Sequence, residues 1–168
     1  MKKLILFLFG LMFLFTFFYN KEEKDILIPS NAIRFRIIAN SNNFNDQQLK
    51  MKVKDEVFKY MITKNFQNMN REELVSEIKN DDGLNNILNK YTNNYSINYG
   101  YNYFPEKTFK GIKYPAGNYE SLVIKIGDGS GDNWWCLLYP PLCFIDEDST
   151  EYKSLVKDII NKFKIIVL

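Results

Sequence analysis

Apolar and polar positions change their spacing along the chain, and each change predicts a different kind of element. In segment 32–40, AIRFRIIAN, apolar residues alternate with two arginines. Ile33, Phe35 and Ile37 would share one face, and Arg34 and Arg36 the other. This alternation predicts a strand.

Helical spacing follows this strand. A first helix is predicted over 46–65, with N-cap candidates at 43–46 and apolar positions at Leu49, Val53, Val57, Tyr60 and Met61. A second helix is predicted to begin at Asn70, because Asn70 and Glu73 resemble a capping box. A third is predicted over 84–91.

The second half of the chain returns to alternation. Segment 95–103 predicts a strand with one aromatic face. Strands over 119–126 and 133–139, joined by the glycine-rich turn 127–132, predict a β-hairpin. Segment 152–168 predicts an amphipathic C-terminal helix. This order predicts a single α+β domain, in which helices pack on one face of an antiparallel or mixed sheet.

The N-terminus is basic and then apolar, which is the form of an export signal. Lys2 and Lys3 precede an apolar run from Leu4 to Tyr19. As a helix this run spans about 24 Å, slightly less than a hydrocarbon core of about 30 Å. It lacks the small-x-small pattern of a cleavage site, so we favour a signal-anchor, with a cleaved signal peptide as the close alternative.

The predicted organisation follows from this segment. Residues 1–19 are a signal peptide or signal-anchor, 20–31 a polar tether and 32–168 an exported domain. The two lysines would stay in the cytoplasm, and the domain would be secreted or membrane-anchored on the outer side.

Composition narrows the chemistry. The 168 residues carry a formal net charge of +2, which argues against a nucleic-acid binder. The chain has no histidine, which removes histidine triads and histidine metal ligands. Its two cysteines alone cannot complete a tetrahedral zinc site. We therefore predict no cofactor, no metal and no catalytic residue.

Two features are candidate signs of enzymatic chemistry: a glycine-rich loop and a set of carboxylates. The loop Gly127–Asp132 leads into a strand and lacks a P-loop lysine, so a turn is favoured over a phosphate site. Glu120, Asp128, Asp132 and Asp146 could supply the two carboxylates, about 5–9.5 Å apart, that a glycoside hydrolase needs. The alternative function is therefore an exported cell-wall hydrolase, although no spacing singles out a pair.

Cysteine and tryptophan residues crowd one short segment. Cys136 and Cys143 flank a Pro-Pro bend, and two interpretations stay open: a disulfide, or two buried thiols. Pro141 is a candidate for a cis peptide bond. Trp134 and Trp135 must point to opposite faces of a strand, so one can enter the core while the other faces a helix layer, a neighbouring loop or solvent. A tryptophan that faces outward is a common anchor at protein contacts.

Two long segments carry a resemblance to known proteins: residues 33–57, IRFRIIANSNNFNDQQLKMKVKDEV, and residues 114–144, YPAGNYESLVIKIGDGSGDNWWCLLYPPLCF. Both closely resemble the stage II sporulation protein R family. The resemblance implies a signalling protein of endospore formation, made in the forespore and exported into the space between the two membranes. There it would activate a membrane-embedded aspartic protease of the mother cell, which processes the precursor of an early mother-cell sigma factor. The resemblance implies no enzymatic activity of the chain itself.

Residues of the two resembling segments are the candidates for contact with the protease. We predict that the partner-binding residues include Arg34, Arg36, Asn40, Ser41, Asp46, Tyr114, Trp134 and Trp135. For the two arginines, a solvated strand edge is the alternative to a site for an acidic partner. A membrane-anchored structural module without a signalling role is a third functional hypothesis.

Overall fold

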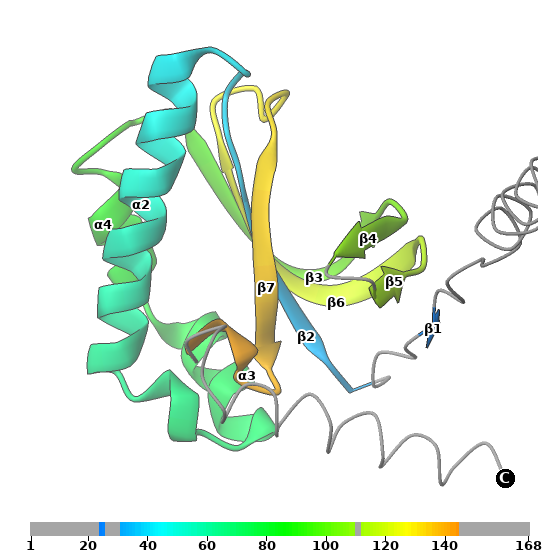
Figure 1. Ribbon diagram of the computed structural model, residues 1–168. Coiled ribbons are helices and arrows are strands. Elements are labelled where there is room, and N and C mark those ends of the chain that lie inside the picture. Colours follow the sequence, from blue (N-terminus) through cyan, green and yellow to red (C-terminus); the bar gives the residue numbers. More distant parts are fainter. Residues whose placement is uncertain (1–23, 26–30, 110–111, 145–168) are drawn as a thin grey trace, which may run out of the picture.

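A computed structural model describes residues 24–25, 31–109 and 112–144 of the chain (Figure 1). The predicted segment 1–19, most of the tether 20–31 and the predicted helix 152–168 lie outside these residues. Within the described part, no helix combines the length and the apolar character that a membrane crossing requires.

The centre of the fold is a four-stranded mixed sheet in the order β3-β6-β2-β7. Its strands are β2 (Ile33–Ile38), β3 (Tyr95–Phe104), β6 (Gly117–Ile126) and β7 (Asn133–Tyr139). The inner strand β2 runs parallel to β6 and antiparallel to β7, whereas β3 runs antiparallel to β6. A small second sheet joins β1 (Lys24–Asp25), β5 (Ile112–Tyr114) and β4 (Lys107–Phe109).

Helices cover one face of the four-stranded sheet, on the left in Figure 1. They are α2 (Phe44–Thr63), α3 (Arg71–Asn80) and α4 (Gly83–Leu88), with a 3-10 turn η1 (Phe66–Asn68) after α2. A second 3-10 turn, η2 (Leu142–Phe144), follows β7. The predicted α+β class, the mixed sheet and the single helical layer are thus confirmed.

Local sequence signals explain where the helices begin. The Asn43 side chain caps α2 by accepting a hydrogen bond from the Asp46 N–H at 2.8 Å. At α3, Asn70 and Glu73 form the predicted capping box in both directions. The third helix, α4, ends at Leu88, three residues before the predicted end at 91.

The core lies between the helices and the sheet. Phe35 and Ile37 of β2 and Leu122 and Ile124 of β6 are fully buried there. The facing helical side chains are Val53, Val57, Met61, Leu74, Leu84 and Leu88. Each Å² of apolar area that this layer buries stabilises the fold by about 25 cal/mol.

The predicted hairpin between strands 119–126 and 133–139 is wrong. Both strands form, but β2 lies between them in the sheet. Loop 127–132 therefore crosses the end of β2 instead of closing a two-stranded turn. The hairpin that does form is β3 with β6, and β4 and β5 lie between these two strands in the chain.

Candidate functional site

The glycine-rich loop 127–132 is clasped against the turn that follows β2. The Gly131 N–H donates to the Ala39 carbonyl at 3.0 Å, and the Ser130 N–H donates to the Asn40 carbonyl at 3.1 Å. The Asn40 side chain accepts from the Asp128 N–H at 3.0 Å. We call residues 39–42 and 127–132 together the clasp.

Glycine is required where the clasp is tightest. A Cβ at Gly131 would lie 2.3 Å from the Ser41 carbonyl oxygen, which is a backbone atom and cannot rotate away. Gly127 and Gly129 adopt φ values of +56° and +60°, in the left-handed region that favours glycine. The loop is thus shaped to fit the turn after β2.

Asp46 fastens the clasp to the first turn of α2. Its Oδ2 accepts from the Ser41 hydroxyl at 2.6 Å, from Asn40 Nδ2 at 2.8 Å and from Asn43 Nδ2 at 2.9 Å. These hydrogen bonds, that of Ser41 first, hold the pKa of Asp46 below its usual value. The structure thus brings together three predicted contact residues, Asn40, Ser41 and Asp46, and gives each a partner inside the fold.

Lys50 is a buried residue of this region that sequence reasoning missed. It is 6% exposed, and its Nζ donates to the Gln47 Oε1 at 2.6 Å and to the Asp132 carbonyl at 3.0 Å. Burial lowers the pKa of Lys50. Its spacing could have revealed it, since 50, 53, 57 and 61 form the buried stripe of α2.

The two arginines of β2 lie on the sheet face opposite the helices. The Arg34 guanidinium carbon is 3.4 Å from the Tyr119 ring centroid and 4.9 Å from that of Phe104. The Arg36 guanidinium carbon lies 4.4 Å from the Phe104 centroid. These distances are in the cation–π range.

The solvated-edge alternative for these arginines is wrong. β2 is an inner strand, and Arg34 is only 2% exposed. Arg36 is half-buried, and burial lowers its pKa. A partner could therefore contact Arg36 directly, but it could reach Arg34 only if the aromatic rings above it moved.

The consecutive tryptophans point to opposite faces of β7, as predicted. Trp134 enters the core, with ring centroids 5.1 Å from Phe58 and 6.0 Å from Phe35. Trp135 is paired in register with Arg36 on the other face, where the Lys107 Nζ lies 5.7 Å from its ring. Trp135 and Arg36 are both half-buried and are neighbours on the sheet face that does not pack against the helices.

The Pro-Pro segment brings the two cysteines together. A disulfide joins Cys136 and Cys143, with the Cα atoms 5.4 Å apart, so the disulfide interpretation holds. The cis peptide bond precedes Pro140, and the prediction for Pro141 is wrong. The predicted contact residue Tyr114 lies in β5, where it pairs with Lys107 of β4 in the small second sheet.

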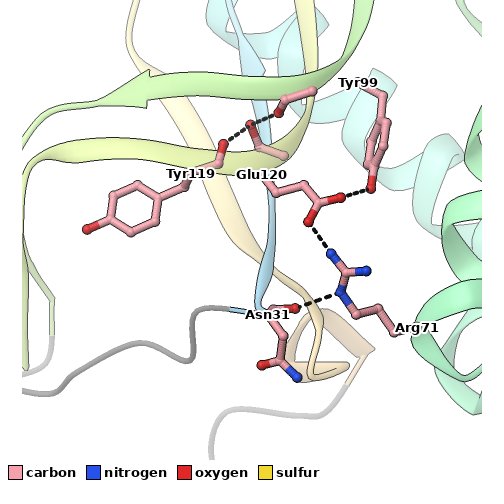
Figure 2. A network of polar contacts seen from close by, with 7 residues as sticks. Asn31, Arg71, Tyr99, Tyr119 and Glu120 are labelled. Atoms are coloured by element: carbon pink, nitrogen blue, oxygen red, sulfur yellow. Dashed lines mark hydrogen bonds and ion pairs between the residues drawn. The ribbon is translucent and has the colours of Figure 1, made fainter.

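An ion-pair network ties three elements together and was not predicted (Figure 2). Glu120 of β6 accepts from Arg71 Nη2 at the start of α3 and from the Tyr99 hydroxyl of β3. Arg71 Nε also donates to the Asn31 carbonyl at 3.1 Å, just before β2. Burial, with the hydrogen bond to Glu120, raises the pKa of Tyr99.

The network argues against Glu120 as one of the two carboxylates of a glycoside hydrolase. Glu120 is committed to Arg71 and Tyr99, and six strand residues separate it from the end of β6. At about 3.3 Å per residue this is about 20 Å, so Glu120 cannot pair with Asp128 or Asp132. Asp146 lies outside the described residues. In the described part, no three acidic or cysteine side chains are grouped as a metal site would need.

Comparison with known proteins places the chain in a family. The sequence profile of stage II sporulation protein R (spore_II_R) matches residues 29–149. The stage II sporulation protein R of Bacillus subtilis (strain 168) is 38% identical over 144 residues, which cover 77% of this chain and 61% of that protein. The chain thus spans about three fifths of the length of this relative. No solved structure matches the chain. The matched region includes every described helix and every strand of the four-stranded sheet, and the chain belongs to the stage II sporulation protein R family.

Proposed function

We propose that the chain is an exported signalling protein of endospore formation that activates a membrane-embedded aspartic protease of the mother cell. That protease would then process the precursor of an early mother-cell sigma factor. The observation that carries the proposal is the family match over residues 29–149. The basic and apolar N-terminal sequence supports export from the forespore into the space between the two membranes.

The geometry supports a role in binding. Asp46, Lys50 and Glu120 carry reactive groups, but each is held by contacts that join elements of the fold. By contrast, Trp135 and Arg36 lie side by side on a face that the helices leave uncovered. Aromatic and arginine side chains are the commonest energetic anchors of protein interfaces.

Activation by contact has a simple thermodynamic basis. A ligand shifts a protein toward the state that it binds more tightly, and only by the difference between its affinities for the two states. The exported domain would therefore bind the active state of the protease more tightly than the inactive state. The clasp and the Glu120 network would keep its contact surface rigid.

Co-expression of the chain with the protease and the sigma-factor precursor tests the proposal. We expect precursor cleavage to rise when the chain is exported, and to fall about tenfold when Trp135→Ala removes a central anchor. Asp55→Ala is the matched control, because Asp55 is an exposed residue of α2 on the opposite side of the sheet. Unchanged cleavage on export of the wild-type chain would refute the proposed function.

A further inference from the structure

β3 forms one edge of the four-stranded sheet, and half of its backbone groups point away from the sheet. Among the described residues, β3 pairs with β6 alone. The Gly127 N–H donates to the Asn94 carbonyl at 2.8 Å, at the start of this ladder. Because alternate residues of an antiparallel strand bond to the same neighbour, the outward N–H and C=O groups belong to the other set. This set is Tyr95, Ile97, Tyr99, Tyr101 and Tyr103.

This edge lacks the features that usually prevent strand addition. Proteins protect exposed edges with charged residues, prolines, bulges or short strands. The ten residues of β3, YSINYGYNYF, include no charged residue and no proline. Tyr101 and Tyr103 are 75% and 61% exposed. Tyr, Asn, Ser and Gly are also the residues that dominate antibody contact loops, where tyrosine supplies a large, rigid contact area.

A groove of about 560 Å³ lies along the first part of β3. Tyr95, Ser96 and Ile97 of β3 line one wall. The other wall comes from the end of α3, the following turn and α4. The Tyr95 hydroxyl spans the two walls, because it donates to Asn89 Oδ1 at 3.0 Å. A strand edge beside a helical wall is the arrangement by which several peptide-binding domains hold an extended segment.

The charged residues that line the groove indicate which kind of side chain would bind there. Two acidic residues, Asp81 and Asp82, and one basic residue, Lys79, line it, and the Lys79 Nζ lies 5.5 Å from the centroid of the Tyr99 ring. Asp81 Oδ1 lies 3.8 Å from Lys64 Nζ, and its Oδ2 is buried without a hydrogen-bond partner. Asp82 is exposed and makes no ion pair within the described part of the chain. A basic side chain would therefore complement this end. The β3 of a second copy has no basic residue to offer, so self-pairing would leave Asp82 unmatched.

We propose that the β3 edge and this groove bind an extended segment of a partner protein, with a lysine or arginine of that segment placed against Asp82. Main-chain hydrogen bonds to the outward groups of β3 supply affinity, and the groove supplies selectivity. The inference deepens the proposed function and rests on it for the identity of the partner, which would be the protease. It adds a second contact to the one that Trp135 and Arg36 offer.

Two changes to the full chain, each paired with a comparison variant and co-expressed with the protease and the precursor, test the two parts of this site. Tyr101→Pro removes one outward N–H and leaves the bonds to β6 intact, since proline is tolerated on the outer side of an edge strand. Tyr101→Ala loses the ring but keeps that N–H. Asp82→Lys reverses the charge of the groove, and Asp55→Lys makes the same change on exposed α2. We expect cleavage to fall about tenfold with Tyr101→Pro and with Asp82→Lys, and to stay within about twofold with Asp55→Lys.

Cross-linking adds a measurement that does not alter the backbone of β3. A photoreactive amino acid at position 103 of the full chain should capture the protease, whereas the same group at exposed position 48 of α2 should not. If the wild-type chain raises cleavage and Tyr101→Pro and Asp82→Lys raise it equally, this docking site is wrong and the proposed function stands. If the wild-type chain leaves cleavage unchanged, the proposed function itself fails. A cross-link between two copies of the chain would also overturn the site.

Discussion

The aromatic contact between Trp134 and Phe58 joins the edge strand β7 to α2, and its contribution to stability can be isolated. The two rings meet edge to face, with centroids 5.1 Å apart and an interplanar angle of 88°. Such pairs contribute about 0.5–1.5 kcal/mol beyond the burial of their area. A double-mutant cycle of Trp134→Ala, Phe58→Ala and the double variant measures this part directly.

The individual losses can also be worked from the structure. Trp134 contacts two rings, Phe58 and Phe35, so Trp134→Ala loses about 1–3 kcal/mol of pair energy. Removal of a half-buried indole, with about 100 Å² of buried area, adds about 2.5 kcal/mol. We therefore expect Trp134→Ala to lower the free energy of unfolding by about 3.5–5.5 kcal/mol.

The neighbouring residue supplies the matched control. Trp135 is the next residue but lies on the opposite face of β7, across the sheet from Phe58. The cycle of Trp135→Ala with Phe58→Ala should therefore be additive to within about 0.5 kcal/mol. Urea unfolding followed by circular dichroism gives all the free energies without a tryptophan probe. Equal coupling in the two cycles, or none between Trp134 and Phe58, would refute the face assignment.

Three further perturbations test the clasp and the disulfide. The folded pKa of Asp46 is depressed, so its contribution is present above about pH 4 and is lost as the pH falls through the folded pKa. Asp46→Asn should therefore make the free energy of unfolding depend less on pH between pH 7 and pH 3. An equal pH dependence in the variant and the wild type would contradict this. Cys136→Ser opens a loop with a sequence separation of 7 to Cys143 and should cost about 2–3 kcal/mol in urea unfolding; a cost near zero would argue against the bond. Gly131→Ala places a Cβ 2.3 Å from the Ser41 carbonyl oxygen and should cost about 1–3 kcal/mol, seen as faster hydrogen exchange in loop 127–132; unchanged exchange would speak against the clasp.

Local signals in the sequence predicted the local structure well. The capping box at Asn70 and Glu73 placed the start of α3, because both halves of that motif lie within four residues of each other. Alternation placed the strand over 133–139 and assigned the two tryptophans to opposite faces. In both cases the physical cause is contained in a few neighbouring residues.

Long-range arrangement was beyond the same reasoning. The turn chemistry of 127–132 does not reveal that β2 is inserted between the two flanking strands. Alternation showed that Arg34 and Arg36 share a face, but not that Phe104 and Tyr119 cover it. The Glu120 network joins four distant segments, and no spacing along the chain encodes it.

The inner position of β2 has a consequence for the order of events when the chain is made. β2 is the first strand of the four-stranded sheet to be synthesised, yet both of its neighbours, β6 and β7, are synthesised last. Until β6 has been made, Phe35 and Ile37 have a partner on neither side of the strand, and until β7 has been made they have a partner on one side alone. Contacts of such wide sequence separation are slow to form, because a long loop must close first. Under the export that we propose, the chain would therefore stay unfolded, and able to pass through the membrane, until β6 and β7 had crossed.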